Sequence, residues 1–390
     1  MSKGKKSPYH VVQNQIVSLM LMAGFLLAAT GPAQADFVFG PPENLRPPIN
    51  TSLHDYDPGL SGDGLCLIFF RLALDESTLE AWAARRAARS DPWGDPVSLG
   101  PWLATDASDI AMANAGNEIL QGETIPGWYT ADGLETYFSD DRPGGYGGTD
   151  LYVQKRDSVD AGWGPPENLG PNVNTPNNDI WGPVSADGLT LYFSSFGRPD
   201  GYGRSDLYVT TRPTRSDSWG VATNLGPAVN SPSYDIQPIL SPDGLLFFFV
   251  SGRPGGLGDS DLWMTRRANL SDPWEQAVHL GATLNSPADD SSPYISADGS
   301  TLYFQSSRAG GYGGVDLWQA PIIPTVDFNG DSLVDCIDIC DMIDHWGTDT
   351  SLYDIGPMPW GDGIVDAADL LVLAEHLVAD TTDVNDVGNR

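Results

Sequence analysis

The chain has 390 residues, enough for two domains or for one large domain with an appendage. Its hydrophobic residues (41%) and aromatic residues (10%) suffice for a packed core and exclude a disordered chain, and 44 glycines with 31 prolines indicate many turns. The formal net charge of −32 disfavours nucleic acid and anionic lipid as partners; it suits divalent cations, or solubility in an extracellular setting.

The N-terminus has the pattern of a secretory signal. Three lysines precede an apolar run at 16–29 that is too short to span a bilayer comfortably, and Ala-Gln-Ala follows at 33–35. We therefore expect a signal peptide over 1–35, a mature chain from Asp36, and a secreted protein that is extracellular, on the cell surface or periplasmic, without membrane insertion after cleavage. An uncleaved anchor is the alternative.

A repeated tetrapeptide, Ser/Thr-x-Asp-Gly, sets the organisation of the next 290 residues or so. It occurs at 61–64, 130–133, 185–188, 241–244 and 296–299. The last three intervals are 55, 56 and 55 residues, and the first is 69, which indicates one insertion at about 105–125. In each unit an alternating strand follows Asp-Gly, as in LYFSS at 191–195. A Gly-rich loop, as in RPGGYGGTD at 142–150, leads to a third strand, and a Trp turn leads to a fourth.

Four short strands per unit of about 55 residues predict an all-β domain, a five-bladed β-propeller over 36–322. In the first unit EAWAARRAARSDPW (80–93) looks helical, but its alignment with DLWMTRRANLSDPW (261–274) predicts a strand. The fifth unit lacks a fourth strand after Trp318. GPPENL at 40–45 is identical to GPPENL at 164–169, so we expect the N-terminal strand to close the ring.

The repeats resemble the WD-repeat-like propeller repeat of TolB-type and related secreted proteins. The resemblance rests on Ser-x-Asp-Gly, Leu-Tyr-Phe, Arg-Pro-Gly-Gly and Asp-Leu-Tyr-Val in that order. It implies a propeller that serves mostly as an interaction platform, and it implies no activity.

Three sets of residues recur at fixed places in the units. Arginine precedes aspartate by eight residues across the Gly-rich loop, which predicts a structural ion pair in each blade or else a charged ring around a ligand: Arg142 and Asp150, Arg198 and Asp206, Arg253 and Asp261, Arg308 and Asp316. A second set of aspartates starts each first strand, where it would line the channel, either capping backbone amides or binding a cation or ligand: Asp55, Asp179, Asp235 and Asp290, with Thr124 in the second unit.

The third set lies at the tips of the Gly-rich loops. It comprises Tyr146, Tyr202 and Tyr312, with Leu257 in the fourth unit. Exposed aromatic rings beside glycine can stack on sugars or bind a partner protein, and they can equally pack on the neighbouring blade.

An acidic loop near the C-terminus, DFNGDSLVDCID at 327–338, has the spacing of a calcium-binding loop. Oxygen ligands stand at positions 1, 3, 5, 9 and 12 with a backbone carbonyl at 7: Asp327, Asn329, Asp331, Asp335, Asp338 and the carbonyl of Leu333. Two features depart from the usual pattern, Ser332 at position 6 and an aspartate instead of glutamate at position 12. The sequence therefore predicts calcium as the cofactor.

This loop, a helix expected at 337–346 and a second copy resemble a type I dockerin module, EF-hand-like, over 325–379. The second copy, MPWGDGIVDAAD at 358–369, keeps Asp362, Asp366 and Asp369 and is followed by a helix, but Met358 and Trp360 replace ligands. Asp354, before the inserted IGPMP, lacks the required spacing. The resemblance implies docking to a cohesin-like module on a scaffold, or to a cell-envelope protein. Residues 380–390 are expected to be a disordered tail, and Cys336 with Cys340 a buried thiol pair.

The chain contains no Gly-x-Ser-x-Gly, HExxH or Walker motif. Two functional hypotheses follow. The first is a secreted non-catalytic propeller that binds a glycan or protein and docks through its calcium module. The second is a glycoside hydrolase or lyase of polysaccharide catabolism, in which two channel carboxylates would act on a glycosidic bond.

Overall fold

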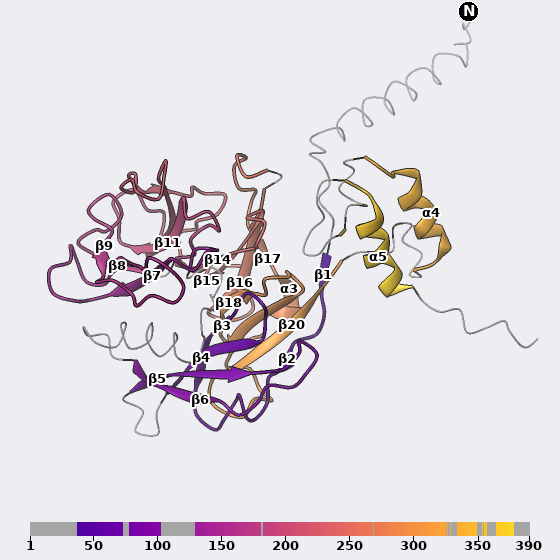
Figure 1. Cartoon of the computed structure of the whole chain (residues 1–390), viewed down its shortest axis with the longest axis horizontal. Coiled ribbons are helices and arrows are strands. Elements are labelled where there is room, and N and C mark those ends of the chain that lie inside the picture. The colour runs from indigo at the N-terminus through magenta and orange to yellow at the C-terminus, as the bar shows by residue number, and fades with distance from the viewer. Residues whose placement is uncertain are drawn as a thin grey trace, which may run out of the picture.

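The computed structural model describes residues 37–72, 78–102, 129–180, 182–267, 269–324, 326, 328, 334–348, 353, 355–356 and 364–377. These residues form five blades in a propeller arrangement and a helical module beyond the last blade (Figure 1). The expected signal peptide, the insertion at 105–125 and the C-terminal tail lie outside the described residues. None of the described helices has the length and apolar character needed to cross a bilayer.

Each blade is an antiparallel meander, as the repeats predict. Blade 1 contains β3 (Asp55–Leu60), β4 (Cys66–Leu72), β5 (Leu79–Arg85) and β6 (Val97–Trp102). Blade 2 contains β7 (Glu135–Asp140), β8 (Asp150–Lys155) and β9 (Glu167–Asn168), with a bridge from Tyr129 to Thr136 on its inner side. Blade 3 contains β10 (Asp179–Ile180), β11 (Thr190–Phe196), β12 (Ser205–Thr211) and β13 (Thr223–Asn224).

Blade 4 contains β14 (Asp235–Leu240), β15 (Leu246–Ser251), β16 (Asp261–Arg266) and β17 (Val278–His279), followed by the short helix α3 (Gly281–Leu284). Blade 5 contains β18 (Asp290–Ile295), β19 (Thr301–Ser306) and β20 (Asp316–Pro324), together with β1 (Phe37–Phe39) and β2 (Glu43–Asn44) from the start of the chain. The strand predicted for the helix-like segment of the first unit is confirmed, since β5 pairs with both β4 and β6.

Closure of the ring by the N-terminal strand is also confirmed. In β2, Glu43 and Asn44 pair with Gln319 and Trp318 of β20, and this gives blade 5 its fourth strand. Asn50 locks the joint, because its buried side-chain amide donates to the Leu317 carbonyl at 2.8 Å and accepts from the Leu317 amide at 2.9 Å. The edge that a linear array of blades would expose is thereby covered.

The core runs through the middle of the blades. In β15 three consecutive phenylalanines, Phe247, Phe248 and Phe249, are all buried, because neighbouring blades cover both faces of the strand. The Asp-Gly turns close the first hairpin of each blade. In blade 3 the Asp187 carboxylate accepts from the Ser185 hydroxyl and the Leu189 amide, and Gly188 has a φ of +73° that favours glycine.

The C-terminal module consists of α4 (Cys336–Asp344) and α5 (Ala367–His376), close to the two helices expected from the sequence. They pack around a small apolar core made of Val326, Met342, Ile355, Val365 and Leu373. The prediction of a buried thiol pair is wrong: Cys336 and Cys340 are exposed free thiols, since the helix turns Met342 rather than the cysteines toward the core.

Candidate functional site

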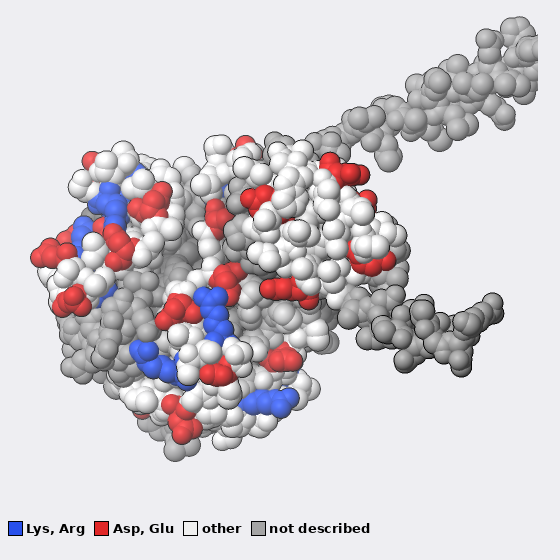
Figure 2. Space-filling view, turned by 45° about the vertical axis from the view of Figure 1, so that its right-hand side comes forward, with Lys and Arg blue, Asp and Glu red and all other residues white. Residues whose placement is uncertain are grey.

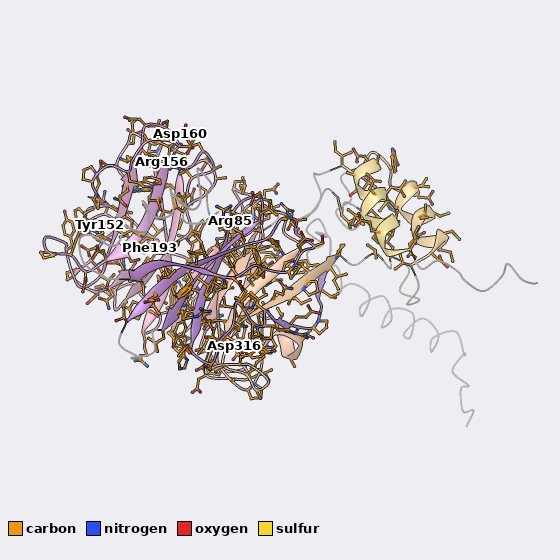
Figure 3. All side chains as sticks on the ribbon, turned by 60° about the horizontal axis from the view of Figure 1, so that its bottom comes forward. Arg85, Tyr152, Arg156, Asp160, Phe193 and Asp316 are labelled. Carbon is orange, nitrogen blue, oxygen red and sulfur yellow. The ribbon has the colours of Figure 1, made fainter. Side chains whose placement is uncertain are left out.

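The Gly-rich loops connect the second and third strands of blades 2–5, so they share one face of the propeller, here called the loop face. The Asp-Gly turns lie at the opposite ends of the strands, on the turn face. In blade 2, Arg156 and Tyr152 lie toward these opposite ends of β8 (Figure 3).

The predicted partner of each loop-face arginine was wrong. Arg198 pairs with Asp179 at 2.9 Å, and not with Asp206. Arg253 and Arg308 likewise pair with the aspartates that begin their own blades, Asp235 at 2.6 Å and Asp290 at 2.5 Å. In blade 1 the equivalent pair is Arg71 with Asp55 at 2.6 Å, and in blade 2 Arg142 pairs with Asp140.

These pairs have the contacts of structural joints. The Arg253 guanidinium lies between the rings of Phe249 and Trp263, 5.2 and 4.8 Å from their centroids, and also donates to the Val229 carbonyl in the segment that enters the blade. The Asp235 carboxylate is wholly buried and accepts from the backbone amide and hydroxyl of Ser231. The ring of Asp55, Asp179, Asp235 and Asp290 is therefore used for capping and ion pairing within the blades.

The aspartates at the start of the third strands hold the Gly-rich loops in place. The Asp206 carboxylate accepts from the amides of Tyr202 and Gly203, and Asp150, Asp261 and Asp316 accept from the equivalent loop amides. Burial raises the pKa of Asp206, and the two amide hydrogen bonds oppose that rise. The loops also press on the next blade: a side chain at Gly203 would lie 1.9 Å from the Ser233 carbonyl oxygen.

The loop tips present their side chains to solvent. Tyr146, Tyr202 and Tyr312 are 49, 49 and 50% exposed, and Leu257 is 46% exposed. The backbone of each loop packs on the neighbouring blade, whereas the ring at its tip does not share that burial. Four consecutive blades thus carry half-exposed apolar groups on one face, held by rigid loops.

A second polar site lies on the inner strands and was not identified from the sequence. Asp57, Gln237 and Ser292 occupy equivalent places in blades 1, 4 and 5, two residues after the aspartate that starts the strand. All three have positive φ (47°, 54° and 50°), where the register of the inner hairpin shifts. Such backbone costs about 1–3 kcal/mol per residue and is often associated with function. A sequence signal exists, because each residue precedes a proline and the copies disagree there.

Hydrogen bonds join these residues into what we call the channel cluster: Asp57, Gln237, Ser292 and Gln305. The Ser292 hydroxyl donates to the Asp57 carboxylate and accepts from the Gln237 amide at 2.8 Å. The side-chain amide oxygen of Gln305 accepts from the Asp57 backbone amide at 2.9 Å. Because the inner strands of a propeller surround its axis, the cluster faces the central channel.

Asp57 differs from the aspartates of the ring. It is half-buried, and its carboxylate accepts a hydrogen bond from the Ser292 hydroxyl, whereas each aspartate of the ring pairs with an arginine. Burial raises the pKa of Asp57, and the Ser292 hydrogen bond opposes that rise. A carboxyl group with a raised pKa keeps its proton to a higher pH than an ordinary aspartate does, and it can hydrogen-bond to hydroxyl groups.

The calcium ligands predicted in the C-terminal module are only partly described. Asp327, Asn329, Asp331, Leu333 and Asp362 lie outside the described residues. Asp335 and Asp366 cap α4 and α5, each in a reciprocal capping box. Asp338 and Asp369 are buried, and within the described part of the chain no group of three acidic, histidine or cysteine side chains is close enough to hold a metal.

The hydrogen bonds of the module correct the alignment of its second loop. Asp338 accepts from the Phe328 amide at 2.7 Å, and Asp369 accepts from the Ile355 and Gly356 amides at 2.6 and 2.7 Å. Ile355 therefore takes the place of Phe328, although it lies further from its aspartate along the chain. In the sequence Asp354 precedes Ile355 as Asp327 precedes Phe328, so Met358 is not the counterpart of Asp327.

Neither a protein-family model nor a curated protein sequence matches the chain. Similar solved structures include a protein of Agrobacterium tumefaciens described as TolB, with 19% identity over 71% of this chain and 80% of that one and a TM-score of 0.38. A thermostable family-43 glycoside hydrolase has 14% identity over 71% and 91% and a TM-score of 0.42. An alpha-L-arabinofuranosidase from Lactobacillus brevis has 14% identity over 72% and 93% and a TM-score of 0.42. These values leave the function to be argued from the residues of this chain.

Proposed function

We propose that the chain is a secreted, carbohydrate-binding β-propeller that receives a polysaccharide on its loop face. The observation that carries the proposal is the row of half-exposed tyrosines at equivalent loop tips, Tyr146, Tyr202 and Tyr312. Their rings are held by capped, closely packed loops, so little conformational entropy is lost when a sugar stacks on them. The acidic surface disfavours nucleic acid as the ligand.

We expect the double substitution Tyr202→Ala, Tyr312→Ala to weaken polysaccharide binding by about tenfold or more, since each aromatic contact contributes about 0.5–1.5 kcal/mol beyond its buried area. Affinity electrophoresis against plant and algal polysaccharides, followed by calorimetry on the best ligand, measures this loss. Leu270→Ala is the matched control, because Leu270 is an exposed apolar residue of the turn face. Equal binding by the double variant and the control contradicts the proposal.

Hydrolysis of the bound glycan is the second candidate function, and Asp57 favours it. A half-buried acid with a raised pKa, on strained backbone and at a position where the repeats disagree, has the properties of a general acid. Asp55, Asp179, Asp235 and Asp290 are paired with arginines and therefore lack these properties.

If the propeller is a hydrolase, Asp57→Asn is expected to lower kcat by at least about a hundredfold, because the amide cannot transfer the proton. Reducing-sugar release from the polysaccharide that binds best is the measurement. Asp259→Asn, at an exposed loop aspartate, is the control for the change of charge. Binding without sugar release by the unaltered protein excludes this candidate and leaves the binding function intact.

We further propose that the C-terminal module binds calcium and docks the protein to a cohesin-like or cell-envelope protein. The support is the ligand spacing in 327–338 and the acidic residues that remain in the second loop. Asp335 and Asp338, and their counterparts Asp366 and Asp369, fit such a site because they lie where each loop enters its helix. The ion would draw the loop oxygens together and so order the two loops for docking.

Calcium titration of the metal-free protein is expected to give two sites per chain, and Asp354→Ala is expected to leave one. The reason is the alignment above, which makes Asp354 the counterpart of Asp327. Calorimetry counts the sites, and Asp344→Ala, at an exposed aspartate at the end of α4, is expected to retain both. A single site in the unaltered protein, or two sites in Asp354→Ala, contradicts the assignment of Asp354.

A further inference from the structure

A cavity of about 340 Å³ lies between blades 5 and 1 on the turn face. Its polar lining includes Arg86, Arg89, Asp298, Thr301, Tyr303 and Gln319. The volume is at the lower end of the range of about 300–1,000 Å³ that small-molecule sites occupy. The cavity is on the opposite side of the propeller from the loop-tip tyrosines and outside the channel cluster.

The equivalent place between blades 2 and 3 is filled by protein. There Arg212 donates to the Glu135 carboxylate at 2.5 Å and to the Tyr137 hydroxyl at 3.0 Å. Arg215 contacts the same Glu135 carboxylate at 3.5 Å and also pairs with Asp132 of the Asp-Gly turn. Two guanidinium groups therefore face two carboxylates, and their charges balance.

The interface between blades 5 and 1 repeats this arrangement with one group missing. By repeat position Arg86 and Arg89 correspond to Arg212 and Arg215, and Asp298 corresponds to Asp132. Arg89 pairs with Asp298, as Arg215 pairs with Asp132. The counterpart of Glu135, however, is Thr301, whose side chain is short and neutral. The space that the glutamate would fill remains as the cavity, and one of the two guanidinium groups has no carboxylate to balance its charge.

The remaining polar contacts of the cavity also match. Arg86 stacks on Trp93 at 4.2 Å and donates to the Gly64 carbonyl, as Arg212 stacks on Trp219 at 4.5 Å and donates to the Gly188 carbonyl. Arg86 also hydrogen-bonds to the Tyr303 hydroxyl, the counterpart of Tyr137. Both guanidinium groups are thus held in place before any ligand arrives.

The second arginine is specific to these two interfaces. In blade 4 the first arginine is kept as Arg267, which stacks on Trp274, but Leu270 stands where Arg215 and Arg89 stand. In blade 2 that place is taken by Val159. An arginine at this position therefore occurs with an internal carboxylate in one interface and with a cavity in the other.

We infer that the cavity between blades 5 and 1 binds the carboxylate of a small organic acid in the place that Glu135 fills between blades 2 and 3. Arginine forks suit carboxylates, since two parallel N–H donors match the two oxygens. The hydroxyl of Thr301 and the amide of Gln319 add hydrogen-bonding groups for hydroxyl substituents. A hexuronate monosaccharide and a short aliphatic carboxylate share the required chemistry.

The test uses calorimetric titration of the whole mature chain with glucuronate, acetate, glucose and inorganic phosphate. Saturable binding of glucuronate or acetate, at least about tenfold tighter than glucose, is expected, because a charge-assisted hydrogen bond is lost with the neutral sugar. If glucuronate binds more tightly than acetate, the site recognises a sugar acid. If the two bind equally, the site recognises the carboxylate group alone. Binding of phosphate without either carboxylate, or no binding at all, overturns the inference.

Thr301→Glu supplies the missing carboxylate from within the protein. It is expected to abolish glucuronate binding and to preserve or raise the thermal midpoint, because Glu135 pairs with the two arginines of the interface between blades 2 and 3 in the same way. Arg89→Leu, which copies Leu270 of blade 4, is expected to weaken binding at least about tenfold. Thr190→Glu is the matched control, since Thr190 occupies the same repeat position in blade 3, where Leu270 replaces the second arginine of the next blade. A folded Thr301→Glu variant that still binds glucuronate as the unaltered protein does refutes the site.

Failure of this test leaves the proposed glycan site untouched. The tyrosines of that site lie on the loop face, and their double variant keeps Arg86, Arg89 and Thr301. Loss of glucuronate binding in the tyrosine variant would place the ligand on the loop face and would also overturn the assignment of the cavity.

Discussion

Replacing Asp235 with alanine is expected to lower the free energy of unfolding by about 3–5 kcal/mol. The substitution leaves the Arg253 guanidinium buried between two aromatic rings without its carboxylate, and it removes the acceptor for the Ser231 amide. Urea unfolding followed by tryptophan fluorescence measures the change, with Trp263 beside the altered pair as one reporter.

The exposed pair of Lys155 and Glu167, 2.9 Å apart, provides the control. Surface ion pairs contribute about 0–1 kcal/mol, so Glu167→Ala is expected to change stability little. If Asp235→Ala destabilises the propeller no more than Glu167→Ala does, the joints between arginine and aspartate are not what holds the blades together.

A chain that begins at Thr51 is expected to lose about 5 kcal/mol or more of stability, which corresponds to roughly 10 °C in thermal midpoint. It lacks β1 and β2, the buried Ile49 and the two hydrogen bonds of Asn50, and it exposes the edge of β20. Differential scanning calorimetry against a chain that begins at Phe37 gives the difference.

A peptide of residues 37–50, added in excess, is expected to restore part of the lost thermal midpoint, because it can pair with β20 from outside. An unchanged thermal midpoint of the shortened chain would mean that β1 and β2 do not stabilise the fifth blade.

The repeats allowed the architecture to be predicted from the sequence. A strand-forming segment that is ambiguous in one copy, such as residues 80–93, is decided by the others, because equivalent positions must occupy equivalent places in a ring. The identity of 40–45 with 164–169 likewise identified the closing strand. Each of these inferences rests on a pattern that the chain itself repeats.

The partners of the arginines could not be read from their spacing. In the sheet Ser195 pairs with both Asp179 and Asp206, so both carboxylates lie beside Arg198. Asp206 already accepts from the amides of its own loop, and that leaves Asp179 to the guanidinium. Blade 2 supports this account: Thr124 replaces the ring aspartate in the sequence, and Arg142 uses Asp140, which takes the place of Ser195.

The channel cluster escaped prediction for a different reason. Its members come from blades that are far apart in the chain, and Ser292 reaches Asp57 across 235 residues. Asp57, Gln237 and Ser292 share a positive φ before proline, and the usual backbone preference of residues before proline is for extended conformations. The cavity beside Arg89 also needs distant repeats to be compared, since Thr301 stands there at the position that Glu135 has in blade 2.

Acidic and basic side chains are interspersed over the left and lower parts of the face shown in Figure 2, so the large negative charge does not by itself mark either site. The balance of charge within the interface between blades 5 and 1 indicates a site, whereas the net charge of the chain does not. That balance depends on which blades are neighbours, and the sequence alone does not give the contacts between them.

The closing strand also determines the order in which the propeller can be completed during synthesis. Asn44 bonds to Asp316, 272 residues later, so the first-made strands of the domain are the last to acquire their partner. Blades 1–4 can form one after another as the polypeptide lengthens, while Phe37 and Phe39 remain unpaired until β20 has been made. Contacts of such long range slow folding and leave apolar strands open to association with other nascent chains. Synthesis of β20 is thus the event that allows the ring to close.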